Sequence, residues 1–130
     1  MESIELNKLV DGWIALQKTR FESGQYEALF WAYEAVWNLV AAKPPEALEF
    51  ILAVLKCDSS STIMENLSAG PLEDLLVGHG SLLIEKIEEE AKMNPVFASL
   101  LGGVWKNRMD DSVWKRVVAI RNRSGWDGNP

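Results

Sequence analysis

The sequence predicts an all-α fold, a compact array of about seven to eight antiparallel helices in a helical-hairpin or short HEAT-like arrangement. Apolar residues recur at spacings of three and four along most of the chain, which is the period of an amphipathic helix. No segment alternates apolar and polar residues over more than a few positions, so we expect no strand. The 130 residues, 48% of them hydrophobic, can supply one core, and we expect a single domain over residues 1–130.

The first two helices are expected over residues 4–21 and 26–42, with an interruption at Gly24. Pro44 and Pro45 end the second helix and start another, because proline disfavours a helical conformation in the residue before it and fits a first helical turn. The second helix has a wide apolar stripe, which predicts deep burial. Its members are Leu29, Phe30, Tyr33, Val36, Trp37 and Val40.

The middle of the chain is expected to form four shorter helices. Asp58 and the serines after it separate the first two, and Gly70 with Pro71 ends the second and starts the third. Gly78 and Gly80, on either side of a histidine, separate the third from the fourth. The four helices are expected over residues 46–55, 62–67, 72–77 and 82–91.

A helix over residues 96–105 is expected to begin at Asn94 and Pro95, a cap followed by a proline. Gly102 and Gly103 interrupt its apolar stripe. Each glycine costs about 1 kcal/mol relative to alanine inside a helix. This cost indicates a helix end or a close approach of another backbone, and we favour a close helix crossing.

The last helix is expected over residues 110–121, where Asp110 and Asp111 supply the cap. Residues 124–130 are polar and contain glycine, which is typical of a frayed tail. From Pro44 onward the pattern indicates three successive helix pairs, over residues 46–67, 72–91 and 96–121.

The charge is uneven along the chain. The formal net charge is −6, but residues 1–91 carry 6 Lys/Arg against 16 Asp/Glu, while residues 92–130 carry 7 against 3. A net negative charge argues against general binding to nucleic acid or anionic lipid. We expect the basic tail to balance the acidic helices, with contact to phosphate or an acidic partner as the alternative. The tail cations are Lys106, Arg108, Lys115, Arg116, Arg121 and Arg123.

The expected localisation and chemistry of the protein follow mainly from sequence signals that are absent. No secretory signal or membrane-spanning run is present, and the single cysteine, Cys57, cannot form an internal disulfide, so we expect a soluble, cytoplasmic protein with Cys57 buried. No nucleotide-binding, metalloprotease or hydrolase motif occurs, and one histidine with one cysteine cannot build a zinc site. We therefore expect no enzyme activity, no cofactor and no metal.

Two kinds of residue are candidates for function. His79 follows Glu73 and Asp74, so a carboxylate-histidine pair is conceivable, although a helix cap or local hydrogen bond is the favoured reading. Four tryptophans, at positions 13, 37, 105 and 114, fall on apolar stripes and are expected in the core. Trp31 and Trp126 lie off these stripes and are candidates for a partner surface.

The run AGPLEDLLVGHG at residues 69–80 is followed by an Ile-Glu-x-Glu-Ala stretch at residues 87–91 and by LLGGVWKN at residues 100–107. This combination resembles an uncharacterised family of small bacterial all-helical proteins, over roughly residues 44–117. The resemblance implies a helical fold and bacterial origin, but no activity. It also implies that one set of residues acts together as a structural corner. This set is Gly70, Pro71, Leu72, Glu73, Asp74, His79, Gly103 and Trp105.

Our first functional hypothesis is a binding module, such as an immunity or antitoxin-like protein that masks a basic protein partner through an acidic helical face. The expected partner surface comprises Glu73, Asp74, His79, Glu85, Glu88, Glu89, Glu90, Trp31 and Trp126. One alternative is a structural adaptor that holds a peptide on a concave face, which an apolar groove would favour. Another is a small hydrolase-like enzyme with a site around Glu73, Asp74 and His79. A homodimer through exposed tryptophans is a further option.

Overall fold

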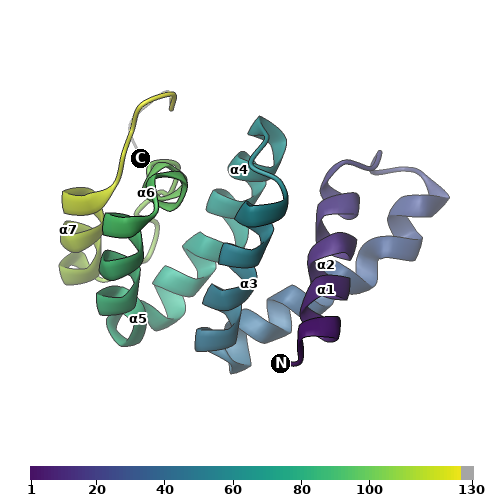
Figure 1. Cartoon of the computed structure of the whole chain (residues 1–130), viewed down its shortest axis with the longest axis horizontal. Coiled ribbons are helices and arrows are strands. Elements are labelled where there is room, and N and C mark those ends of the chain that lie inside the picture. Colours follow the sequence, from purple (N-terminus) through teal and green to yellow (C-terminus); the bar gives the residue numbers. More distant parts are fainter. Residues whose placement is uncertain (127–130) are drawn as a thin grey trace.

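A computed structural model describes residues 1–126 of the chain, and these residues form helices without a strand, which confirms the all-α class. The N-terminal pair and α7 lie at opposite ends of the long axis, with α3 and α4 between them (Figure 1). The elements are α1 (Ser3–Gln17), α2 (Gly24–Ala42), α3 (Pro44–Cys57), α4 (Ser61–Leu67), the π-helical turn η1 (Ser68–Leu72), α5 (Glu73–Met93), α6 (Pro95–Leu101) and α7 (Asp111–Ile120).

Caps and prolines set several helix ends where the sequence predicts them. The Ser23 hydroxyl accepts a hydrogen bond of 3.0 Å from the Tyr26 backbone N–H at the start of α2. α2 ends just before Pro44, which begins α3. The Asn94 side chain accepts a bond of 3.2 Å from the Phe97 N–H at the start of α6. α1, by contrast, ends at Gln17, four residues before the predicted end.

Two predicted helix breaks in the middle of the chain are wrong. α4, η1 and α5 follow one another without a loop, because a π-helical turn accommodates Pro71, which has no backbone N–H to donate. At the second site α5 only kinks, at His79, whose φ of −138° and ψ of 19° depart from helical values. The predicted middle helix pair is therefore one kinked helix, and His79 lies inside it, not at a helix end.

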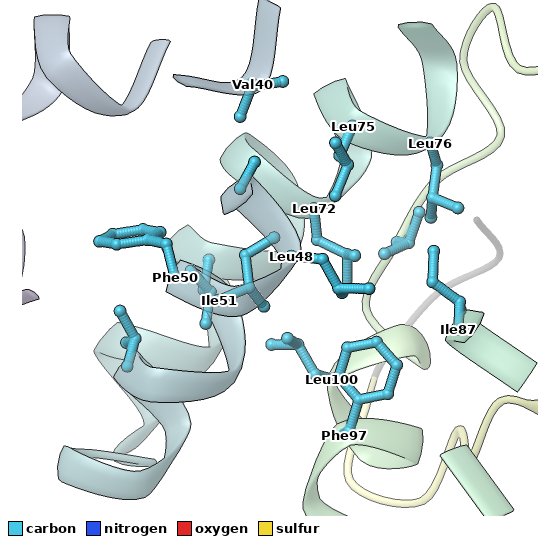
Figure 2. Close-up of a cluster of buried hydrophobic side chains, with 14 of the residues drawn as sticks. Val40, Leu48, Phe50, Ile51, Leu72, Leu75, Leu76, Ile87, Phe97 and Leu100 are labelled. Atoms are coloured by element: carbon cyan, nitrogen blue, oxygen red, sulfur yellow. The ribbon is translucent and has the colours of Figure 1, made fainter. Parts of the chain in front are cut away.

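The core is one cluster of buried apolar side chains to which α1 through α7 contribute. At its centre, α3 and α6 face the segment formed by η1 and α5 (Figure 2). Burial of this surface is the main driving force for assembling the helices. The side chains labelled there include Phe50 and Ile51 of α3, Leu72 of η1, Leu75, Leu76 and Ile87 of α5, and Phe97 and Leu100 of α6.

Gly102 and Gly103 follow the end of α6 and accept close neighbours, which are the segment after α7 at both glycines and also Ser68 of η1 at Gly103. A Cβ atom at Gly102 would overlap the carbonyl oxygen of Asn122, and one at Gly103 would stand 2.6 Å from the Ser68 hydroxyl oxygen. The expected helix crossing is thus a docking site for the segment after α7. Trp126 of the predicted frayed tail packs here, Ser124 and Gly125 are exposed, and residues 127–130 lie outside the described part.

Candidate functional site

α2 carries a row of aromatic side chains that faces solvent. Tyr26, Phe30, Tyr33 and Trp37 are spaced by four, three and four residues and so share one face, which we call the aromatic face. Ring centroids of Tyr26 and Phe30 lie 6.1 Å apart and those of Phe30 and Tyr33 lie 5.2 Å apart. Phe21 extends the row from the preceding loop, 5.1 Å from Tyr26. Tyr33 is 49% exposed and Trp37 59% exposed.

The predicted deep burial of Phe30, Tyr33 and Trp37 is therefore wrong. α2 is apolar on most of its circumference, so periodicity alone does not select the side that packs. The selection comes from α1: a Cβ atom at Gly12 would stand 3.4 Å from the Ala32 Cβ, so the two helices approach closely where both have small residues. The Trp31 ring also packs over Gly12, so α2 turns its Trp31 and Ala32 side toward α1, and the side that carries Phe30, Tyr33 and Trp37 points away. The buried side of α2 consists of Ala32, Val36, Leu39 and Val40.

Two hollows open beside Trp37, where α2 meets η1 and α5. The first, which we call the Trp37 hollow, has a volume of about 210 Å³ and is lined by Trp37, Val40, Ala41, Asp74, Gly78 and His79. The second has a volume of about 90 Å³ and is lined by Trp13, Tyr33, Val36, Trp37, Val40, Gly70, Pro71 and Asp74. Together with the aromatic face they form a largely apolar groove, and one carboxylate, that of Asp74, lies in both hollows.

Asp74 and His79 thus line the same hollow. They are two of the three residues of the site predicted around Glu73, Asp74 and His79. Neither side chain has a hydrogen bond or ion pair with another residue of the described range 1–126. Desolvation raises the pKa of the Asp74 carboxyl, and the charge of neighbouring Glu73 raises it further. The preferred role of His79, a cap or local hydrogen bond, is absent.

The charges that border the part of the aromatic face on α2 are negative, whereas Arg20 lies beside Phe21 at the far end. Residues 21–42 contain three glutamates and no lysine or arginine. Glu27 and Glu34 directly follow Tyr26 and Tyr33, so at 100° per residue they border the face along its length. Asp74 borders it on the side of α5. A cation bound along this groove would meet carboxylates on both sides.

A family model described as a family of unknown function, DUF6869, matches residues 19–125. The chain belongs to the DUF6869 family. This confirms the resemblance to an uncharacterised family, and the matched part includes α2 and the Trp37 hollow. Neither a curated protein nor a solved structure matches the chain.

The structural corner expected from the resemblance exists in part in this DUF6869 protein. Glu73 accepts hydrogen bonds from the Trp105 backbone N–H, at 3.1 Å, and from the Asn107 side-chain amide, at 3.2 Å. It therefore ties the start of α5 to the loop between α6 and α7. The Asp74 and His79 side chains make no hydrogen bond to this loop within residues 1–126; they line the Trp37 hollow instead.

The remaining predicted acidic residues of α5 do not form one free surface. Glu88 binds Arg116 of α7 through both carboxylate oxygens, and this contact lowers the pKa of Glu88. Glu90 accepts a bond of 3.1 Å from the Asn94 side chain. Glu85 and Glu89 are exposed. A partner-binding role for these acids stays a prediction, but Glu88 and Glu90 already have intramolecular partners.

The predicted interface tryptophans are both partly engaged within the DUF6869 chain. Trp31 packs its six-membered ring over Gly12, with the Lys8 ammonium 5.7 Å from the ring centroid. Trp126 covers Gly103 and donates a hydrogen bond of 2.7 Å from Nε1 to the Ser99 carbonyl. Their role toward a partner stays a prediction.

Four of the six cations of the basic tail have partners within the chain, and one of them, Arg116, pairs with the acidic helix α5. Lys106 lies 2.7 Å from Asp111, and Arg116 binds Glu88. The Arg121 guanidinium lies 5.1 Å from the Trp114 ring centroid, and Arg123 donates a bond of 2.8 Å to the Gly102 carbonyl. Lys115 and Arg108 are exposed.

Two expectations about burial elsewhere are wrong. Trp105 is 54% exposed, because α6 ends at Leu101 and the helical stripe that would have buried this ring stops there. Cys57 is also exposed, at the last residue of α3. Over residues 1–126 no three His, Cys, Asp or Glu side chains are grouped to hold a metal ion, and no helix there has the length and hydropathy to cross a bilayer.

Proposed function

We propose that this DUF6869 protein is a non-enzymatic protein-binding module, and that its aromatic face binds a basic segment of another protein. The supporting observation is a row of four aromatic side chains on α2, three of them exposed and Tyr26 half-buried, which carboxylates border and which contains no lysine or arginine within α2. Exposed aromatic patches on soluble proteins mark interaction sites, and aromatic residues supply much of the binding energy at interfaces. The carboxylates select a positively charged partner and speed the encounter.

The same charges disfavour other classes of partner. Phosphates of nucleic acid and headgroups of anionic lipid would meet Glu27, Glu34 and Asp74 along the groove, where repulsion opposes binding. A second copy of this chain would bring two acidic faces together. A basic protein segment meets no such repulsion, and its apolar side chains can cover the rings.

This proposal keeps the basic partner expected from the sequence and moves the main contact surface from α5 to α2. The reason is that Glu73 and Glu88 already bond within the chain, whereas Phe30, Tyr33 and Trp37 of the aromatic face are exposed. Masking of a basic partner, as a bacterial cytoplasmic immunity or antitoxin-like protein would do, is one use of such a face. An adaptor that holds a peptide would use it in the same way. The enzyme alternative has less support, because Glu73 bonds to the loop after α6 and only Asp74 and His79 of the expected site line the open Trp37 hollow.

The experiment is selection of binders from a library of random short peptides displayed on phage, with the purified protein as target. Trp37→Ala and Tyr33→Ala test the aromatic face. The matched control is Trp105→Ala, because Trp105 is 54% exposed, close to the 59% of Trp37, but lies at the loop between α6 and α7. Circular dichroism checks that each variant keeps its helices.

We expect selected peptides rich in arginine or lysine beside apolar residues, with affinity about tenfold or more weaker for Trp37→Ala and unchanged for Trp105→Ala. Selected peptides that are acidic, or that bind Trp37→Ala as well as the wild type, would contradict the proposal. Failure to enrich any peptide on the wild type beyond the Trp37→Ala/Tyr33→Ala double variant would contradict it as well.

A further inference from the structure

We infer that the partner's segment is anchored by one arginine or lysine side chain, which lies against the Trp37 ring and places its charge beside the Asp74 carboxylate in the Trp37 hollow. This inference rests on the proposed function and specifies its recognition chemistry. The ligand of the hollow is a single cationic side chain. Asp74 and Trp37 make the two contacts that select it.

The walls of the hollow match the two parts of such a side chain. Val40, Ala41 and the exposed Trp37 ring offer apolar surface to an aliphatic stem. The charged end of arginine or lysine interacts favourably with the face of an indole ring, arginine more often than lysine. The hollow has a volume of about 210 Å³ and is open to solvent, so the side chain can enter from the surface.

The carboxylate of Asp74 gives the hollow its charge preference. The protein removes part of its hydration, and Glu73 next to it adds repulsion; both effects disfavour the ionised form. Within residues 1–126, Asp74 has no ion pair or hydrogen bond that offsets this cost. A ligand cation offsets both effects, whereas an anionic ligand increases them.

The adjoining hollow fixes the direction of the segment relative to the anchor. It is smaller, about 90 Å³, and its lining includes the buried Trp13 ring and Pro71, so it suits a small apolar side chain. Trp37 and Asp74 line both hollows, so the cationic anchor and the small apolar side chain of the bound segment would lie side by side. From there the aromatic face continues away from α5 toward Phe21.

The anchor is tested with a single amino acid as probe, N-acetyl-argininamide, so the test needs no selected peptide. Its uncharged isostere, N-acetyl-citrullinamide, is the ligand control. Binding is followed by ¹H–¹⁵N NMR on the indole N–H of Trp37, which is assigned by its absence in Trp37→Phe. The protein variants are Asp74→Asn and, as a control, Glu89→Gln, an exposed acid on the same helix outside the hollow.

We expect a saturating shift of the Trp37 indole signal with a Kd in the millimolar range, about that of one small contact site. Asp74→Asn and citrullinamide should each weaken binding roughly two- to fivefold, the factor of an exposed ion pair, and Glu89→Gln should leave it unchanged. Equal shifts with argininamide and citrullinamide, or an unchanged affinity in Asp74→Asn, would overturn the anchor. An indole signal that stays still at about 50 mM probe, far above a millimolar Kd, would overturn it too.

This test and the peptide selection fail separately. Peptides that need Trp37 but bind Asp74→Asn as well as the wild type would leave the binding module intact and remove the cation anchor. If argininamide binds in the hollow but no selected peptide prefers the wild type over the variants, the binding module as proposed is wrong.

Discussion

Gly102 lies directly against the backbone of Asn122: a Cβ atom at Gly102 would stand 2.8 Å from the Asn122 carbonyl carbon and overlap its oxygen. The Asn122 N–H also donates a hydrogen bond of 2.9 Å to the Ala98 carbonyl of α6. Since the clash is with backbone, no side-chain rotation relieves it. The segment after α7 can take this place only while position 102 has no side chain.

Gly102→Ala should therefore lower the free energy of unfolding by about 2–3 kcal/mol, the cost of overpacking a site that cannot relax. The matched control is Gly78→Ala, because no atom lies within 4 Å of a Cβ there. Alanine at that position in α5 should have no cost or raise stability by about 0.5–1 kcal/mol. Urea unfolding measures both, and equal effects of the two substitutions would contradict the packing described.

Glu73→Ala should destabilise the loop that follows α6. It removes the acceptors of the Trp105 backbone N–H and of the Asn107 amide, at a cost of about 1–2 kcal/mol for two partly exposed hydrogen bonds. Glu73→Gln keeps one acceptor oxygen and should recover part of the loss. Hydrogen exchange at the Trp105 amide provides the local measurement. An exchange rate that Glu73→Ala leaves unchanged would show that the bond does not protect it.

Asp58 should make stability depend on pH in the acid range. The Lys18 side chain and then the Ser60 backbone N–H hold the pKa of Asp58 at about 2, against an ordinary 3.8. Because the folded-state pKa is lowered, the contribution is complete above pH 3.8 and disappears as the pH falls toward 2. The melting temperatures of wild type and Asp58→Asn should converge over this window, and high salt should reduce the difference at neutral pH. A constant difference across the window would argue against the ion pair.

Asp74→Asn should make the protein slightly more stable while it weakens binding. The pKa of Asp74 is raised, so its ionised form opposes folding at neutral pH, and this cost vanishes when acid protonates the group. The gain at pH 7 should be at most about 0.5 kcal/mol, the usual limit for a surface change, and absent near pH 3. Thermal unfolding at the two pH values measures it. Loss of stability at pH 7 would indicate a structural role for the carboxylate.

Local signals in the sequence were enough to place several helix ends. Pro44 begins α3 and Asn94 caps α6 as predicted, because proline and cap chemistry act over one helical turn and need no tertiary information. The π-helical turn at Pro71 was not predictable in this way. There the breaking tendency of proline competes with packing of Leu67 and Leu72 on both sides, which are fully buried and keep the chain helical.

The candidate site was predicted only in part, because it depends on which side of α2 is buried. Asp74 and His79 were identified from their position in the chain, and both line the Trp37 hollow. Trp37 and Tyr33 were assigned to the core, since a helix that is apolar nearly all round gives no periodic signal for its exposed side. The signal that could have found them is steric: Gly12 of α1 leaves room for Trp31 and Ala32, so this side of α2 packs and the side with Tyr33 and Trp37 faces solvent.

The docking of Asn122 and Trp126 onto Gly102 and Gly103 has a consequence for synthesis on the ribosome. α6 is translated some twenty residues before the segment that covers its end, as the positions 101 and 122 show. During that interval the two glycines and the Ser99 carbonyl, which Trp126 later binds, are open to solvent. The nascent chain can complete this corner only after residue 126 has left the exit tunnel, so we expect the end of α6 to acquire its native packing later than the start of that helix.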